Sequence, residues 1–493
     1  MALLFVIAGV SRRARKTDSL ADFYLANRGL GTGVLLLTLF ATQYSGNSLS
    51  GFPGQTYRGG LTYYMSVTFM CMIVTGYLLF APRLFRLSRR HRFITPSDYL
   101  THRFANPLLS RLAALVFAVT LINFLLAQLM AMGHAFAGLT EGRIPYWAGV
   151  AGGAAVILIY ELLGGMRAVA WTDALQGSLL ILGLLFVVVL LISIIGPPAA
   201  VLARIAEVAP EKVAAPSYGT AVAWFSNIVL IGLGAPLYPQ AIQRIYAARR
   251  LTELKRALAV MAFLPHFAIT TVVFLGLAGI AVLPTLSGPE SDQVTFRVLA
   301  FVVENRPIAF LPVIMVMMAV VAAIMSTADS CLLSLSSIVT EDLLPRRRLE
   351  PAATGEAARR LSPRHGWVSI LIMAVLVPLA LRPLTTLWDL LVLKFELLIQ
   401  LSPAFVLGTA VGPKAGAEST SDRPTYDRRA FAAPEVVAGL IVGTGLAVAL
   451  SLSGNRLVGG LHAGVIGLGA NYLVVVAGRS LRRRSATDDG RRG

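Results

Sequence analysis

Long apolar runs separated by short polar joints fill almost the whole chain. Two examples are "TFMCMIVTGYLLFAPRLF" at residues 68–85 and "GSLLILGLLFVVVLLISIIG" at residues 177–196. An apolar run of about 18 residues or more is long enough to cross a bilayer as an α-helix. About twelve full-length runs of this kind can be counted. The pattern predicts an all-α, polytopic membrane protein without a separate water-soluble domain.

The composition of the 493 residues agrees with this pattern. Hydrophobic residues make up 56% of the chain, charged residues only 14%, and the mean hydropathy is +0.72. Water-soluble domains contain about 25% charged residues. We therefore expect a multi-pass protein whose surroundings are the lipid bilayer.

Positive charge is concentrated in alternate joints between the apolar runs. Segments such as "RLSRRHR", "LPRRRLEPAATGEAARRLSPRH" and "RSLRRRS" are rich in arginine, whereas "LSGPESDQVTFRVLAFVVENRP" carries several carboxylates. Cytoplasmic loops of membrane proteins hold such an excess of Lys and Arg. The net charge of +18 is thus explained by topology rather than by nucleic-acid binding. It predicts a cytoplasmic C-terminus and a plasma membrane, of the bacterial inner-membrane type.

Few residues offer covalent or metal chemistry. Cys71 and Cys331 are the only cysteines and both fall in apolar runs, so we expect small core side chains and no disulfide framework. The chain contains no GxxxxGK[ST] loop, no HExxH motif and no nucleophile elbow. We therefore expect neither an enzyme nor an ATP-driven pump, and no cofactor or obligate protein partner.

Two of the apolar runs are interrupted in matching places. The first, residues 31–60, changes at Ala41 into the polar segment "ATQYSGNSLSGFPG". The second, residues 223–250, is interrupted by Gly232, Gly234, Pro236 and Pro239. Unwound backbone survives at membrane depth only where protein, water or a ligand satisfies it. A pair of discontinuous helices therefore indicates the central site of a secondary transporter.

Hydroxyl groups follow directly after the apolar run at residues 308–325. In a helix, the side chains of Ser326 and Thr327 cluster beside the carbonyl of Ala323, three and four positions earlier. Free carbonyls of Ala41 and Tyr44 at the first break would complete a set of five oxygens, which suits a small hard cation such as sodium. Alternatively, the hydroxyls only bond back to the preceding turn of their own helix.

Polar residues continue along one face of the same helix. They are Ser326, Asp329, Ser330, Ser334 and Ser337, at spacings of three and four. Such spacing gives a polar stripe, which we expect to face the interior of the bundle. A carboxylate inside a membrane helix is costly and indicates function, so Asp329 favours the functional reading of the stripe.

Together these motifs resemble the sodium:solute symporter family, whose members carry proline, pantothenate, sugars or sialic acid. The matching segments lie between about residue 20 and about residue 480 and are "DFYLANRGLG", "ATQYSGNSLSGFPGQTYRGGL", "GGMRAVAWTDALQG", "YPQAIQRIYAARR" and "AAIMSTADS". The resemblance implies the leucine-transporter fold, with inverted repeats of five helices each, two broken helices and additional peripheral helices. It also implies a sodium site at Ala41, Tyr44, Ala323, Ser326 and Thr327, the same five residues reached above.

The resemblance also implies an organisation of the chain. We expect a truncated first helix and basic cytoplasmic segment at 1–30, repeats at 31–195 and 219–411, a cytoplasmic loop at 412–432, two peripheral helices at 433–480, and a basic cytoplasmic tail at 481–493. The opening "MALLFVIAGV" is too short to span at about 1.5 Å per residue, so this helix is either clipped or interfacial.

Asp173 in "AWTDALQ" has two interpretations. It matches a family aspartate near the cytoplasmic exit of the sodium path, where some members form a second cation site with residues just after the Ser-Thr pair. Asp329 and Ser330 occupy those positions here. Alternatively, Asp173 caps the start of the next helix, because "TDALQ" begins an apolar run.

Candidate solute contacts are polar residues beside the two breaks. They are Gln43, Ser45, Asn47 and Tyr238, with Asn123 and Gln128 on a neighbouring helix. Such side chains also hold membrane helices together without any ligand. The proline carriers of the family have an aspartate where Gln43 stands, and they have aromatic and polar residues where Ile231 and Ala235 stand. These departures argue against proline as the solute.

The run at 384–405 carries three charged residues. Glu396 and Gln400 each fall within about 20° of Asp389 around a helix, whereas Lys394 points about 140° from Asp389. Lys394 either contacts a substrate carboxylate or pairs with a buried acid, and we favour the second reading. Glu396 is a further candidate solute contact.

The sequence therefore predicts sodium-coupled symport of a small polar or anionic organic solute by alternating access. One alternative is a proton-coupled symporter that uses Asp329 or Asp173. Another is a transporter-like solute sensor, whose output would come from a second protein because the chain closes with the short tail "RSLRRRSATDDGRRG". A channel fits less well, because broken helices predict an occluded site.

Overall fold

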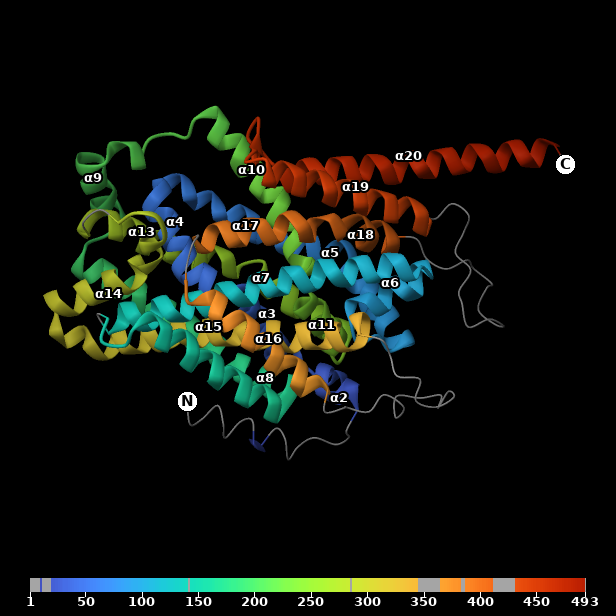
Figure 1. Ribbon diagram of the computed structural model, residues 1–493. Helices are drawn as coiled ribbons and strands as arrows, with labels where there is room; N and C mark the ends of the chain where they lie inside the picture. The colour runs from blue at the N-terminus through green and yellow to red at the C-terminus, as the bar shows by residue number, and fades with distance from the viewer. Residues whose placement is uncertain are drawn as a thin grey trace.

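The computed structural model describes residues 9–10, 19–140, 142–283, 286–344, 364–382, 386–410 and 431–492. Within these ranges the regular structure is almost entirely helical (Figure 1). Ten helical stretches there are long and apolar enough to cross a membrane, and two shorter apolar helices, Thr32–Gln43 and Arg364–Ala380, accompany them. The all-α prediction is confirmed. The difference from the expected twelve full-length spans lies in these two shorter helices.

The first half of the chain folds into these elements: α2 (Leu20–Leu25), η1 (Ala26–Arg28), α3 (Thr32–Gln43), η2 (Asn47–Gly51), α4 (Phe52–Gly59), η3 (Gly60–Met65), α5 (Ser66–His91), α6 (Pro96–Phe104), α7 (Pro107–Leu139), α8 (Tyr146–Ile194), α9 (Pro198–Val208) and η4 (Pro210–Lys212). The polar segment 96–104 becomes the short helix α6, whose start is fixed because Asp98 accepts hydrogen bonds from the backbone N–H groups of Ile94 and Thr95.

The second half contains α10 (Tyr218–Gly234), η5 (Ala235–Leu237), α11 (Pro239–Ala247), α12 (Leu251–Met261), α13 (Leu264–Val282), η6 (Gly288–Gln293), α14 (Val294–Asn305), η7 (Pro307–Ala309), α15 (Phe310–Ile338), η8 (Val339–Leu343), α16 (Arg364–Ala380), α17 (Leu387–Leu398), η10 (Ile399–Leu401), α18 (Ser402–Ala410), α19 (Ala433–Leu452), β1 (Leu457–Val458), β2 (Leu461–His462) and α20 (Ala463–Arg492).

Both predicted helix breaks are present. The first apolar run ends as α3 at Gln43, Tyr44 is extended with φ −98° and ψ 91°, and the chain resumes as η2, a short π-helix, and α4. The second run ends as α10 at Gly234 and passes through η5 and the non-helical Tyr238, with φ −53° and ψ 129°, before α11 begins at Pro239. Pro239 stands at the first helical position, where a missing N–H leaves no intrahelical bond unmade.

The continuous helix α8 contains two membrane spans that meet at a kink. Gly165 has φ +57° and ψ −159°, and a Cβ there would lie 2.6 Å from the ring of Phe23. Only glycine adopts this backbone conformation without strain. The second span therefore starts at Gly165, so the later residues of the motif "GGMRAVAWTDALQG" lie inside the span.

The centre of the bundle is formed around α15. This helix packs against α7 and α8 and also touches α3 and α11, the last two being the halves of the broken helices. The segment before α3 is tied to the end of α11, because Leu30 N–H donates to the Ala247 carbonyl and Arg249 N–H donates to the Leu30 carbonyl. Both breaks are thereby held beside the polar stripe of α15.

Helices α19 and α20 lie side by side along one edge of the bundle, where α20 runs out beyond the other helices (Figure 1). The antiparallel pair β1 and β2 joins them through Gly459 and Gly460, both of positive φ. The expected basic tail, up to Arg492, continues α20 as a helix. In the expected loop 412–432, residues 412–430 lie outside the described residues. In the expected segment 1–30, residues 1–8 and 11–18 do so as well.

Candidate functional site

The first break leaves backbone oxygens without helical partners. Tyr44 N–H still donates to the Phe40 carbonyl, at 2.9 Å, but Ser45 N–H turns to the hydroxyl of Ser48, at 3.4 Å. The Ala41 carbonyl is therefore released from the helix, as expected for the last turn of a helix. Ala41 is fully buried and Tyr44 is almost so, which places free carbonyls in the protein interior.

The Ser-Thr pair of α15 faces this released carbonyl. The hydroxyl oxygen of Thr327 lies 3.3 Å from the Ala41 carbonyl oxygen and 3.2 Å from that of Ala323. Ser326 is fully buried, and its hydroxyl does not bond back to its own helix; it is oriented toward the carboxylate of Asp173 without a fully formed hydrogen bond. Back-bonding thus accounts for only one of the contacts of Thr327 and none of Ser326. Three of the five predicted oxygens, those of Ala41, Ala323 and Thr327, therefore lie together, and carbonyl and hydroxyl oxygens suit a hard monovalent cation.

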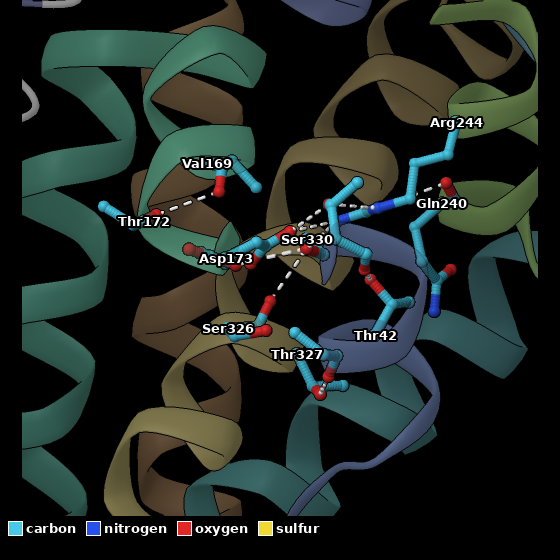
Figure 2. A network of polar contacts seen from close by, with 12 residues as sticks. Thr42, Val169, Thr172, Asp173, Gln240, Arg244, Ser326, Thr327 and Ser330 are labelled. Atoms are coloured by element: carbon cyan, nitrogen blue, oxygen red, sulfur yellow. Dashed lines mark hydrogen bonds and ion pairs between the residues drawn. The ribbon is translucent and has the colours of Figure 1, made fainter. Parts of the chain in front are cut away.

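A buried ion pair lies next to this point (Figure 2). Arg244 of α11 and Asp173 of α8 are both fully buried, and the distance from Nη2 to Oδ2 is 2.7 Å. Arg244 also lies 2.6 Å from the hydroxyl of Ser330 and 2.7 Å from that of Thr38, which donates to Asp173. Its remaining Nη1 donates to the Gln240 carbonyl at 3.0 Å. A guanidinium group therefore neutralises the aspartate that was expected to help hold a second cation.

The interpretation of Asp173 as a helix cap is wrong. The second span of α8 begins at the Gly165 kink, eight positions before Asp173, so Asp173 lies in the buried interior of that span. Sequence reasoning also missed Arg244 and Thr38. Arg244 carried a usable signal, since it is an ionisable residue in the motif after the second break and such residues inside a membrane rarely lack a function.

The polar stripe of α15 faces the bundle interior as predicted. Its five members, Ser326, Asp329, Ser330, Ser334 and Ser337, are all buried. Ser334 donates to Gln243 of α11 at 2.6 Å, and Gln243 in turn donates to Ser337 at 3.0 Å. Asp329 lies 3.2 Å from the hydroxyl of Ser330. The stripe thus joins α15 to the helix that follows the second break.

A central cavity lies between the two breaks. Gln43, Ser45 and Ser48 line it from the first break, and Ala235 and Tyr238 line it from the second. Other walls come from α5, α7 and α17, and the empty space, including the opening, is about 480 Å³. Both amide atoms of Gln43 are buried without a hydrogen-bond partner among the described residues. A mostly apolar lining with a few convergent polar groups is typical of a small-molecule site.

Of the six uncharged side chains predicted to contact solute, three line this cavity and two do not. Gln43, Ser45 and Tyr238 are wall residues. Gln128 instead accepts from the N–H of Gly46 at 3.0 Å and so satisfies unwound backbone. Asn123 is absent from the walls. The side chain of Asn47 lies outside the described part of the structure.

The interpretation of Lys394 as the partner of a buried acid is wrong for the described residues. Lys394 is 1% exposed and lines the cavity, and it takes part in no ion pair or hydrogen bond there. Glu396 points away from the cavity: it accepts from Ser451 at 2.8 Å and lies 3.8 Å from His462. The two charges lie two positions apart on one helix, which directs them to different faces.

The sequence relationships of the chain agree with this geometry. Residues 23–409 match the family model described as the sodium:solute symporter family. The chain belongs to this family. Family membership confirms sodium-coupled solute symport and a secondary transporter rather than an enzyme.

Two relatives and one solved structure illustrate the range of similarity. The high-affinity proline transporter PutP of Bacillus subtilis (strain 168) is 30% identical over 67% of this chain and 69% of its own length. The Uncharacterized symporter YhjB of the same organism is 28% identical over 60% of each chain. A substrate-bound, outward-open Na+-coupled sialic acid symporter has a TM-score of 0.72 at 18% identity, covering 97% of this chain and 96% of that one. The last likeness confirms the predicted fold class.

One end of the symporter's cavity is covered by aromatic rings. Phe52 lines the cavity and lies 5.5 Å from Tyr63 and 6.2 Å from Trp388, measured between ring centroids. Trp224 adds a ring 5.2 Å from Tyr63. These rings join α4, α10 and α17, so any opening at this end would have to separate the two broken helices.

Asp292 of η6 ties the same end together. It forms an ion pair with Arg58 at 3.3 Å and accepts from the N–H of Leu387, where α17 begins, at 2.9 Å. Burial raises the pKa of this carboxyl to about 6, although Arg58 and the Leu387 N–H act in the opposite direction. A single side chain thus connects the first broken helix, the η6 loop and α17, and it titrates not far below neutrality.

Proposed function

We propose that sodium binds where α3 ends against α15 and that a small organic solute binds in the adjoining central cavity. The sodium ligands are the carbonyl oxygens of Ala41, Tyr44 and Ala323 and the hydroxyls of Ser326 and Thr327. The observation that carries the proposal is the Ser326 hydroxyl. It is buried and forms no complete hydrogen bond with a described residue, although it is oriented toward Asp173, and its neighbour Thr327 reaches across to the Ala41 carbonyl.

Coupling between ion and solute follows from the segment they share. Sodium would satisfy carbonyls at residues 41 and 44, and the side chains of Gln43 and Ser45 in the same short segment line the solute cavity. Binding of the cation therefore orders the backbone that presents the solute contacts. Each ligand lowers the ordering cost of the other, which is the reciprocal coupling that symport requires.

The Asp173–Arg244 pair is proposed to stand on the exit path of sodium rather than in a second sodium site. Thr38 links the two places, because its hydroxyl contacts both charged groups and its carbonyl accepts from Thr42 at 2.7 Å. The guanidinium supplies the positive charge that Asp173 and Ser330 would otherwise take from a cation. Transport then requires one sodium at the Ser-Thr site.

The direction of transport is proposed from loop charge. Arginine-rich joints such as 86–92 and the end of α20 belong on the cytoplasmic side. The C-terminus is then cytoplasmic and the aromatic end of the cavity faces outward. The sodium gradient of a plasma membrane, of the bacterial inner-membrane type, would therefore drive import by alternating access.

The test is sodium-dependent protection of the purified protein against thermal unfolding, with potassium as ionic control. A ligand that binds only the folded state and is present at a concentration 100 times its Kd stabilises that state by about 2.7 kcal/mol. The wild type should be protected and S326A/T327A should not. The matched control is S336A/T340A, which removes a Ser and a Thr that donate to carbonyls of their own helix and should keep full protection.

The outcome also separates the alternatives. Loss of protection in S326A/T327A alone supports the sodium site. If sodium protects none of the three proteins and uptake into proteoliposomes follows a pH gradient, proton coupling through Asp329 or Asp173 replaces it. Sodium-dependent binding without any uptake would indicate a sensor.

A further inference from the structure

The cavity between the two breaks contains a buried lysine without a counter-charge among the described residues. Lys394 is 1% exposed, and its Nζ belongs to no ion pair within 4.0 Å and to no hydrogen bond among the described residues. The described residues that line the cavity include no aspartate or glutamate. A charge held in the membrane interior without a counter-charge is costly, and such a residue is a functional-site candidate.

Aromatic rings surround the ammonium group on the protein side. Nζ lies 3.2 Å from the centroid of the Phe124 ring, 5.4 Å from that of Tyr238 and 5.5 Å from that of Phe395. Phe124 and Tyr238 are stacked at 4.9 Å, which fixes this wall. Ring faces attract a cation but do not neutralise it. The charge of Lys394 is therefore held in place and left available to the cavity.

A second unsatisfied group shares the cavity. Gln43 offers an amide N–H₂ and an amide oxygen, both buried and without a partner among the described residues. An ammonium group with an amide donor is suited to a carboxylate, which accepts from both. Most of the remaining wall is apolar, with Ile73, Ile231 and Leu391 among its members.

We propose that the solute is a small organic monocarboxylate with a largely apolar body, and that Lys394 binds its carboxylate. The proposal rests on the proposed function and names the class of solute for the same cavity. It also predicts that a solute with an added ammonium group is disfavoured, since the described walls provide no acidic partner for it. Lys394 is thus a specificity-determining residue of the symporter.

The experiment uses the full chain in detergent with sodium present. Acetate, propionate, pyruvate and lactate are compared with acetamide, propionamide and proline as protectants against thermal unfolding, in chloride and in sulfate buffers. At least one monocarboxylate should protect in both buffers, and the amides should not. K394M should weaken that protection about 10- to 100-fold in apparent affinity, while K394R should recover part of it and sodium protection should remain.

The control is E396Q, a change on the same helix at a residue turned away from the cavity, and it should leave carboxylate affinity unchanged. Without solute, K394M should be at least as stable as the wild type, because a buried amine without a counter-charge is removed. A clear loss of stability would show that Lys394 is paired with another group of the protein and would overturn the proposal.

The proposal is also overturned if sodium protects but no carboxylate does, if protection requires only chloride, or if K394M binds the carboxylate unchanged. Each of these leaves the sodium site intact. Absence of sodium protection in the wild type would instead refute the proposed function.

Discussion

The Asp173–Arg244 pair gives the sharpest test of how polar groups hold this symporter together. Both side chains are fully buried, and Arg244 also contacts Thr38 and Ser330. In R244M, Asp173 keeps the hydrogen bond from Thr38 and a weaker contact with the hydroxyl of Ser326, and neither supplies a positive charge. Removal of one member of a buried pair leaves an uncompensated charge, which costs about 3–5 kcal/mol.

The double variant D173N/R244M should be far less damaging than the sum of its parts. It removes both charges together, so the remaining loss is that of a few hydrogen bonds, each worth about 1 kcal/mol. We therefore expect D173N and R244M each to lower the free energy of unfolding by about 3 kcal/mol or more and the double variant by about 1–2 kcal/mol.

The assay is reversible unfolding in mixed micelles of dodecyl maltoside and sodium dodecyl sulfate. R89M is the control, since Arg89 is an exposed arginine with one hydrogen bond to the Arg249 carbonyl, and such a change costs less than about 1 kcal/mol. The reasoning is refuted if R244M costs no more than R89M, or if the double variant equals the sum of the singles. Either result would mean that Asp173 is not an anion paired with Arg244.

Two further predictions concern the ends of the site. For Asp292, burial raises the carboxyl pKa to about 6, so the stability that the protonated side chain contributes is present below about pH 4 and is lost as the pH rises through 6. Over this window the free energy of unfolding of the wild type should fall by up to about 3 kcal/mol relative to that of D292N. Thermal stability that changes with pH equally in the two proteins would contradict this. G46A would place a Cβ 2.8 Å from Ala131 Cβ and 2.9 Å from Gln128 Oε1, so it should cost about 1–3 kcal/mol and weaken sodium protection. G33A, where a Cβ meets nothing within 4 Å, should be neutral or stabilising; equal effects of the two would exclude crowding as the cause.

Much of the site could be predicted because its signals are local. Apolar runs reveal spans, and a Gly- and Pro-containing interruption reveals a break because unwound backbone needs a partner inside a membrane. The Ser326 and Thr327 hydroxyls are fixed beside the Ala323 carbonyl by helix geometry alone. For the same reason the polar stripe of α15 could be assigned to the bundle interior before any packing was known.

Tertiary structure decided which charges meet. Asp173 and Arg244 lie 71 positions apart in the chain, and nothing in either local pattern shows that a guanidinium fills the place where a second cation was expected. Lys394 was expected to find an acid, and only the packing of α17 against α7 and α10 shows aromatic rings and a cavity around it. Helical periodicity gives the face on which a side chain lies, because it depends on neighbours three and four residues away. The partner on that face is set by how helices distant in sequence pack. The sequence by itself therefore determined the spans, the breaks and the oxygens that we propose to bind sodium, and the three-dimensional arrangement determined the ion pair and the central cavity.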